Sequence, residues 1–141
     1  MATNYKAIAK KLKFEGRAFI NGKYVNAIDG KKFETIDPAT GQKLCTVAKC
    51  NHKDVDLAVK VSRKAFNSGV WSRSSPEYRK EVLLKFADIL RKHGDENSVL
   101  ECVDTGKLVA DCINEVANDA PMHFQWYGEL IDKVFGKVGP T

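Results

Sequence analysis

The stretch SPEYRKEVLLKFADILRKHG, residues 75–94, gives the clearest fold signal in the sequence. It opens with a capping serine, a proline at the first helical position and an acid in the first turn, a pattern typical of helix starts. Its apolar residues recur at helical spacing, and we expect them to form a buried stripe: Val82, Leu83, Phe86, Ile89 and Leu90. The group His93-Gly94-Asp95 interrupts the pattern.

Upstream, the period is also helical. Asn51 and Asp54 predict a capping box, and Gly69 predicts the end of the helix that follows. One face of this helix carries Val55, Ala58, Val59, Ser62 and Phe66.

Downstream, we expect a shorter helix from about Glu96 to Val103 that stops at Gly106, and another over roughly 108–117. Proline lacks the backbone N–H that continues a helix, so Pro121 predicts a break, with Asn118 or Asp119 capping a new helix. That last helix runs to Gly136, with Phe124, Tyr127, Ile131 and Val134 aligned.

Two β-hairpins precede the helices. Residues 19–20 and 23–25 flank Asn21-Gly22, which favours a type I′ turn. Residues 32–36 and 43–47 flank the turn Asp37-Pro38-Ala39-Thr40-Gly41. We therefore divide the chain into a basic arm (1–17), hairpins (18–50), helices (51–136) and the approach to a strand (137–141).

The charge is unevenly distributed. The 141 residues carry a net charge of +5, but residues 1–32 hold eight Lys or Arg against two acids, which leaves −1 for the rest. The arm lacks the clustered arginines and interleaved aromatics of a strand-binding groove, so we expect a solvated arm and no nucleic-acid partner. No segment approaches membrane-spanning length or resembles a leader, and the default is a soluble, cytoplasmic protein.

The residues by themselves indicate no reaction. The four cysteines show no zinc-ligand spacing, and neither Cys102 nor Cys112 has a neighbour in sequence that would activate its thiol, so both are interpreted as buried structural residues. Trp126-Tyr127 is interpreted as packing, and Glu129 with Asp132 as a solvated face. No βαβ unit and no glycine loop for a pyrophosphate occurs.

In order, the motifs resemble the amino-terminal part of the aldehyde dehydrogenase superfamily. The series comprises Phe-Ile-Asn-Gly at 19–22, Asp-Pro-Ala-Thr-Gly at 37–41, Asp-Val-Asp at 54–56, Trp71, Asp-Thr-Gly-Lys at 104–107 and Trp-Tyr at 126–127. Three further segments are most similar to members that oxidise amine-derived aldehydes such as γ-glutamyl-γ-aminobutyraldehyde: residues 70–72, 74–76 and 131–136.

The resemblance implies an α/β parent fold, of which this piece is mainly α, with two amino-terminal hairpins and an unfinished carboxyl-terminal strand. It implies an NAD- or NADP-dependent oxidation of an aldehyde to a carboxylic acid by a homo-oligomer. A cysteine thiolate attacks the aldehyde, hydride passes to the nicotinamide, and a glutamate assists hydrolysis. Because those residues would lie downstream of Thr141, we assign no catalytic or cofactor-binding residue here.

One site would be partly present. Some members bind a monovalent cation through positions that match Thr35, Ile36 and Asp104, and backbone carbonyls with a carboxylate suit a hard cation. The alternative is a turn packed against a helix end, with its backbone groups satisfied locally.

A second hypothesis for the whole chain stays open. It is a short, non-catalytic relative that acts as an interaction or oligomerisation module and folds cooperatively alone.

Overall fold

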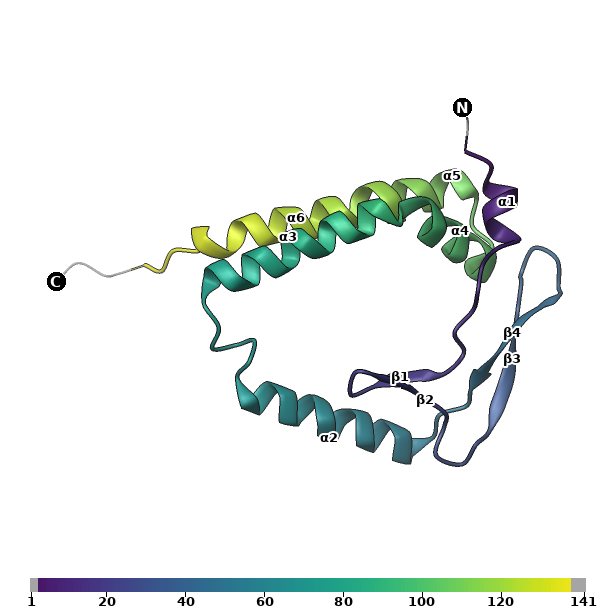
Figure 1. Cartoon of the computed structure of the whole chain (residues 1–141), viewed down its shortest axis with the longest axis horizontal. Helices are drawn as coiled ribbons and strands as arrows, with labels where there is room; N and C mark the ends of the chain where they lie inside the picture. The colour runs from purple at the N-terminus through teal and green to yellow at the C-terminus, as the bar shows by residue number, and fades with distance from the viewer. Residues whose placement is uncertain (1–2, 138–141) are drawn as a thin grey trace.

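The computed structural model describes residues 3–137, in which helices and two hairpins follow one another around an open ring (Figure 1). The helices are α1 (Tyr5–Ala9), α2 (His52–Ser68), α3 (Pro76–Lys92), α4 (Gly94–Thr105), α5 (Val109–Cys112) and α6 (Ala120–Leu130). A π-helical segment η1 (Ile113–Asp119) joins α5 to α6, and a 3₁₀ turn η2 (Ile131–Lys133) follows α6. The strands are β1 (Ala18–Ile20), β2 (Lys23–Val25), β3 (Lys32–Ile36) and β4 (Lys43–Ala48).

Both predicted hairpins are confirmed. β1 pairs antiparallel with β2, and Asn21 and Gly22 between them have positive φ angles of 55° and 74°, as a type I′ turn requires. β3 pairs antiparallel with β4, and the register shifts between Thr35 and Ile36. The two hairpins remain separate two-stranded sheets.

The turn between β3 and β4 is held by Asp37. Its carboxylate accepts hydrogen bonds from the Thr40 hydroxyl and the Ala39 N–H, both at 2.8 Å, and these bonds lower the pKa of Asp37. The turn lies against the end of α4: a Cβ on Gly106 would come within 3.1 Å of the Pro38 side chain. Gly106 has a φ of 75°, so it serves both as the left-handed cap and as the close approach to this turn.

The capping box of α2 is also confirmed. The Asn51 side chain accepts from Lys53 N–H, and the Asp54 carboxylate accepts from Asn51 N–H at 2.9 Å. The second oxygen of Asp54 accepts from Ile28 N–H at 2.8 Å. Asp54 is buried, and it therefore fastens the start of α2 to the segment that follows β2.

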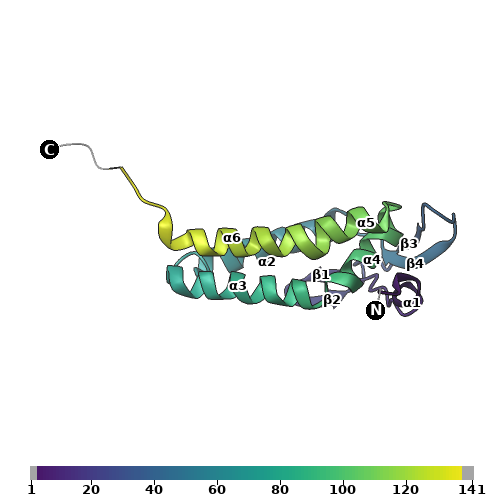
Figure 2. The same ribbon diagram turned by 90° about the horizontal axis from the view of Figure 1, so that it is seen from above.

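Helices α3 and α6 lie side by side along one side of the molecule (Figures 1 and 2). Gly128 of α6 permits the close approach, since a Cβ there would lie 3.1 Å from the Cβ of Leu83. Phe86 and Phe124 meet edge to face with ring centroids 4.7 Å apart. Lys80 Nζ contacts the Asp132 carboxylate at 2.9 Å.

The predicted break at Pro121 is wrong. The chain stays helical from Val109 to Leu130, and neither Asn118 nor Asp119 caps a new helix. The preceding segment is π-helical, with Ala120 N–H donating to the carbonyl of Glu115, five residues back. The wider turn accommodates a proline that a regular α-helix would not. Similarly, α4 begins at Gly94 rather than near Glu96.

The prediction of a fully solvated amino-terminal arm is wrong in part, because the arm contains a helix that packs against the fold. Asn4 caps helix α1 by accepting from Ala7 N–H at 3.1 Å, and α1 packs against α4. Ile8 on this helix is half-buried. The arm therefore contributes apolar contact to the fold in addition to its charges.

The predicted buried stripes are largely exposed. On α3, Ala87 is fully buried and Leu83 and Leu90 are half-buried, but Val82, Phe86 and Ile89 are exposed. The accessible surface is 10837 Å², whereas a compact monomer of this mass exposes about 7,300 Å². Within residues 3–137 the buried apolar side chains are few: Ala27, Ala87, Val99, Cys112 and Pro121.

Among the residues described, no helix combines the length and apolar character needed to cross a membrane. The expected approach to a strand at 137–141 lies outside the described residues, apart from Lys137.

Candidate functional site

Two of the three predicted cation ligands line the same open cavity. Thr35 from β3 and Asp104 from α4 border a space of about 650 Å³ between the second hairpin, α4 and residues 13–15. Ile36 is the next residue along β3 but does not line this space. The fold therefore brings Thr35 and Asp104 together from positions far apart in the sequence.

The backbone at Thr35 and Ile36 departs from a regular ladder. Thr35 pairs with Cys45 and Ile36 with Lys43, so Leu44 is an extra residue on β4. A bulge of this kind disrupts the hydrogen bonding of the ladder locally. This irregularity lies at the two positions whose carbonyls would serve a cation.

Asp104 is the available acid at this cavity. Within residues 3–137 its carboxylate has no hydrogen-bond or ion-pair partner. The other two acids are engaged: Glu15 binds Arg17 at 2.6 Å, and Glu101 lies 3.8 Å from Lys107 Nζ. Hydrogen bonds from Arg17 lower the pKa of Glu15 to about 2, so Glu15 is ionised but committed to its partner.

The sequence held a signal for two further residues of this cavity. Asn97, Glu101 and Asp104 all line it, and their spacing of four and three residues places them on one face of α4. Helical periodicity therefore could have linked Asn97 and Glu101 to Asp104. No local pattern indicates Phe14 or Val116, because each comes from a different element.

The predicted ligands would supply oxygen atoms only: the carbonyls of Thr35 and Ile36 and the free carboxylate of Asp104. Hard cations prefer oxygen ligands, and the residues present fit a weakly held monovalent ion better than a transition metal. Within the described part of the chain, no group of three or more His, Cys, Asp or Glu side chains is arranged to hold a metal ion.

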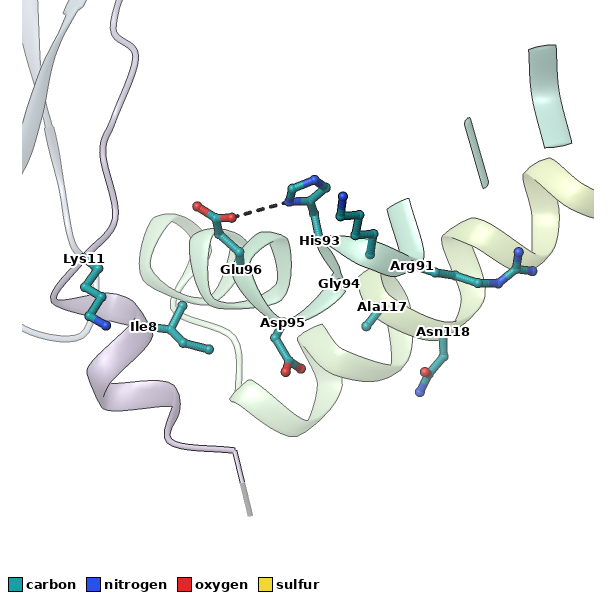
Figure 3. A pocket seen from close by; sticks show the side chains of 10 residues that line it. Ile8, Lys11, Arg91, His93, Gly94, Asp95, Glu96, Ala117 and Asn118 are labelled. Carbon is teal, nitrogen blue, oxygen red and sulfur yellow. Dashed lines mark ion pairs between the residues drawn. The ribbon is translucent and has the colours of Figure 1, made fainter. Parts of the chain in front are cut away.

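A second open cavity, of about 520 Å³, lies at the start of α4 (Figure 3). Its rim carries Lys11, Arg91 and His93, and the His93 ring lies 3.7 Å from the Glu96 carboxylate. Asp95 and Glu96 line the same space, so acids and bases are mixed around it.

The cysteines are placed as structural residues. Cys112 is fully buried, and burial raises the pKa of its thiol, which disfavours the reactive thiolate. Cys102 is only half-buried, and its thiol donates to the carbonyl of Lys107 at 3.1 Å. Neither thiol has the partner that a nucleophile needs.

For the surface residues of α6 and η2, one prediction is confirmed and one is wrong. Glu129 accepts from Gln125, and Asp132 binds Lys80 and Lys133, as expected for a charged surface. Tyr127 is 58% exposed, so its predicted packing is wrong. Its ring contacts Trp126 edge to face at 5.0 Å instead.

A dinucleotide site is absent from the described residues. Each sheet has two antiparallel strands, and no parallel strand leads into a helix. A nicotinamide cofactor would need a phosphate-binding loop at such a junction.

Residues 24–141 match the model of the aldehyde dehydrogenase family. The chain belongs to this family. Its helices and hairpins thus form part of an aldehyde dehydrogenase fold, and the resemblance inferred from the motif series is confirmed.

Similar aldehyde dehydrogenases are known from several bacteria. The NADP/NAD-dependent aldehyde dehydrogenase PuuC of Escherichia coli is 41% identical over 94% of this chain and 27% of its own length. The structure of γ-glutamyl-γ-aminobutyraldehyde dehydrogenase from Burkholderia cenocepacia is 41% identical, with a TM-score of 0.92 over 97% of this chain and 28% of that one. An indole-3-acetaldehyde dehydrogenase of P. syringae, solved with NAD⁺, is 39% identical, with a TM-score of 0.91 over 97% and 28%. This chain spans little more than a quarter of the length of these relatives.

Proposed function

We propose that these residues form the amino-terminal part of an NAD(P)-dependent aldehyde dehydrogenase that oxidises an amine-derived aldehyde to a carboxylic acid. The supporting observation is the match in sequence and fold over 97% of the chain to a γ-glutamyl-γ-aminobutyraldehyde dehydrogenase. The described residues would supply outer helices of the cofactor-binding domain rather than its chemistry. The bound cofactor would accept hydride from the substrate.

The exposed apolar faces support a covering role for these helices. Val59 and Phe66 on one face of α2 are 60% and 65% exposed, and Phe86 and Ile89 on α3 are also exposed. Amphipathic helices of this kind bury their apolar stripe against another layer in a finished domain. In the dehydrogenase, we propose that these faces lie against the rest of the cofactor-binding domain.

The same faces argue against a self-sufficient interaction module. Such a module would have to fold cooperatively, although only five apolar side chains are buried in the part of the chain that the structure describes. Large exposed apolar side chains would instead promote association.

Three further assignments belong to this proposal. We infer a cytoplasmic homo-oligomer, for which the supporting argument is the resemblance to the family. We also propose that Thr35, Ile36 and Asp104 contribute to a monovalent cation site, supported by the shared cavity of Thr35 and Asp104, the bulge beside Ile36, and the unpartnered carboxylate. The division at residues 17, 50 and 136 remains a prediction.

The activity is tested on the full-length protein purified from its source. We expect NADH or NADPH to form when an amine-derived aldehyde is supplied, and faster than with an aromatic aldehyde of similar reactivity. Absence of reduced cofactor with every aldehyde and both cofactors would contradict the proposal. Replacing Na⁺ by K⁺ and then by a large organic cation, with wild type and Asp104→Asn compared, tests the cation site separately.

A further inference from the structure

The π-helical segment η1 connects two helices, α5 and α6, that pack against different helices of the fold. α5 and η1 pack against α4, whereas α6 packs against α3. The fully buried residues along this path are Cys112 before η1 and Pro121 after it, and Gly128 is buried farther on. The rotation between these positions determines whether both ends can face the body of the molecule.

A regular α-helix would place the two buried ends on opposite faces. Cys112 and Pro121 are nine residues apart, and at about 100° per residue they would differ by about 180°. If the path between them advanced as eight residues, the difference would fall to about 80°. Pro121 and Gly128, seven residues apart, lie within about 20° of the same face in either case.

The hydrogen bonding in η1 accounts for the missing step. Ala120 N–H donates to the carbonyl of Glu115, five residues back rather than four. A turn closed in this way contains one residue more than an α-helical turn.

We propose that η1 is a register joint: it holds one residue more than the helix needs to place Cys112 and Pro121 on the same side, about 80° apart, and Pro121 keeps that extra residue in the wider turn. In a regular α-helix the Pro121 ring would collide with the carbonyl four residues back. The wider turn removes that collision, so the proline favours the π form over the α form.

Two contacts fix the joint to α4. Glu115 binds Lys107 Nζ at 2.5 Å, beside the end of α4. At the other end of α4, a Cβ on Gly94 would lie 2.9 Å from the Cβ of Ala117, so only glycine leaves room for the widened turn (Figure 3). The joint also supplies lining residues to both cavities: Val116 to one, Ala117 and Asn118 to the other.

The test is a set of single-residue deletions in the protein that carries these residues, compared by thermal unfolding. Asn118 is exposed, and its only side-chain hydrogen bond in residues 3–137 is a long one of 3.5 Å to Asn114. Deleting it together with Pro121→Ala should give a regular helix with both buried positions on the same side, and Tm should change by no more than about 5 °C. The matched control deletes the exposed Lys85 of α3, which has no stored residue, and should lower Tm by more than about 10 °C.

Each comparison has a contrary outcome. If the Asn118 deletion with Pro121→Ala loses as much as the Lys85 deletion, no residue is stored and the proposal is overturned. If deleting Asn118 with Pro121 retained is tolerated as well as the double change, Pro121 does not hold the joint. Hydrogen exchange of the α6 amides distinguishes detachment of α6 from α3, which would expose only these amides, from a general loss of stability.

Discussion

The apolar faces of α2 and α3 differ in how far they are covered, although the two helices have similar sequence patterns. Helix α6 packs against α3, whereas one face of α2 is exposed. Both α2 and α3 are 17-residue amphipathic helices whose first turn is capped by a side chain. Helix α2 ends at Gly69 in the left-handed conformation, and α3 ends at His93. α3 meets α6 through Gly128 and the Phe86–Phe124 pair, and it meets η2 through the Lys80–Asp132 ion pair. α2 contacts the first hairpin through a different side and leaves Val59 and Phe66 exposed.

The difference shows that periodicity identifies an apolar face but not the surface that covers it. The face of α3 is partly covered because a glycine on α6 lets the two backbones approach. The face of α2 has no such neighbour among the described residues, although its pattern is as regular. A cover must come from another part of the protein or from another molecule.

The largest expected effect comes from disrupting the close contact between α3 and α6. Gly128→Leu places a large side chain where a single Cβ already lies 3.1 Å from Leu83. We expect a loss of about 3 kcal/mol in the free energy of unfolding, measured by urea denaturation. Gly136→Leu is the control, because nothing lies within 4 Å of a Cβ there. Equal losses in both variants would contradict close packing of α6 against α3 at Gly128.

The next effect concerns the hydrogen bonds that hold the start of α2. Asp54→Ala removes the acceptor for the N–H groups of both Ile28 and Asn51. Two backbone donors would lose their partner, which we expect to cost about 2 kcal/mol. The exposed Asp56→Ala is the matched control on the same helix. An Asp54 variant as stable as the control would show that the capping box does not hold α2.

A smaller effect is the pH dependence of the ion pairs of Asp132 in η2, one of which reaches α3. Hydrogen bonds from Lys133 and Lys80 lower the pKa of Asp132 from its usual 3.8 to about 2 in the folded protein. The unfolded state therefore binds a proton first as pH falls. This contribution is complete above pH 4 and is lost between about pH 4 and 2.

The measurement for this prediction is unfolding as a function of pH, with wild type compared to Asp132→Asn. The difference in stability between the two proteins should shrink through that interval. A difference that stays constant from pH 6 to pH 2 would show that the ion pair does not form.

The last prediction concerns the other side of the comparison. The Phe66 side chain is 65% exposed among the described residues. In the full-length dehydrogenase we propose that this face is covered, so Phe66→Ser should lower the free energy of unfolding by about 3 kcal/mol, measured by denaturation of the full-length protein. The exposed Lys64→Ser on the same helix is the control and should change it by less than about 0.5 kcal/mol. A Phe66 variant as stable as this control would contradict the cover.

Local signals predicted most of the elements. Asn21-Gly22 indicates its turn because both residues tolerate positive φ, and Asn51 with Asp54 indicates a helix start by side-chain chemistry that acts over three residues. The continuous helix through Pro121 could not be predicted in the same way. It depends on packing against α4 and α3, which allows a π turn that local preference alone does not favour.

The candidate site was predictable only in part. The resemblance indicated Thr35, Ile36 and Asp104, and helical spacing could have added Asn97 and Glu101. Whether Asp104 is free depends on which bases the other acids hold. Glu15 pairs locally with Arg17, whereas Glu101 lies 3.8 Å from Lys107, which the fold also brings to Glu115 at 2.5 Å.

The most direct test of the central claim is the intact mass of the native protein that carries these residues in its source. Dividing 15.7 kDa by the 28% share of a similar dehydrogenase gives about 56 kDa, and we predict a subunit near that mass. A native mass of 15.7 kDa would contradict the assignment to a dehydrogenase subunit and leave a short, non-catalytic relative.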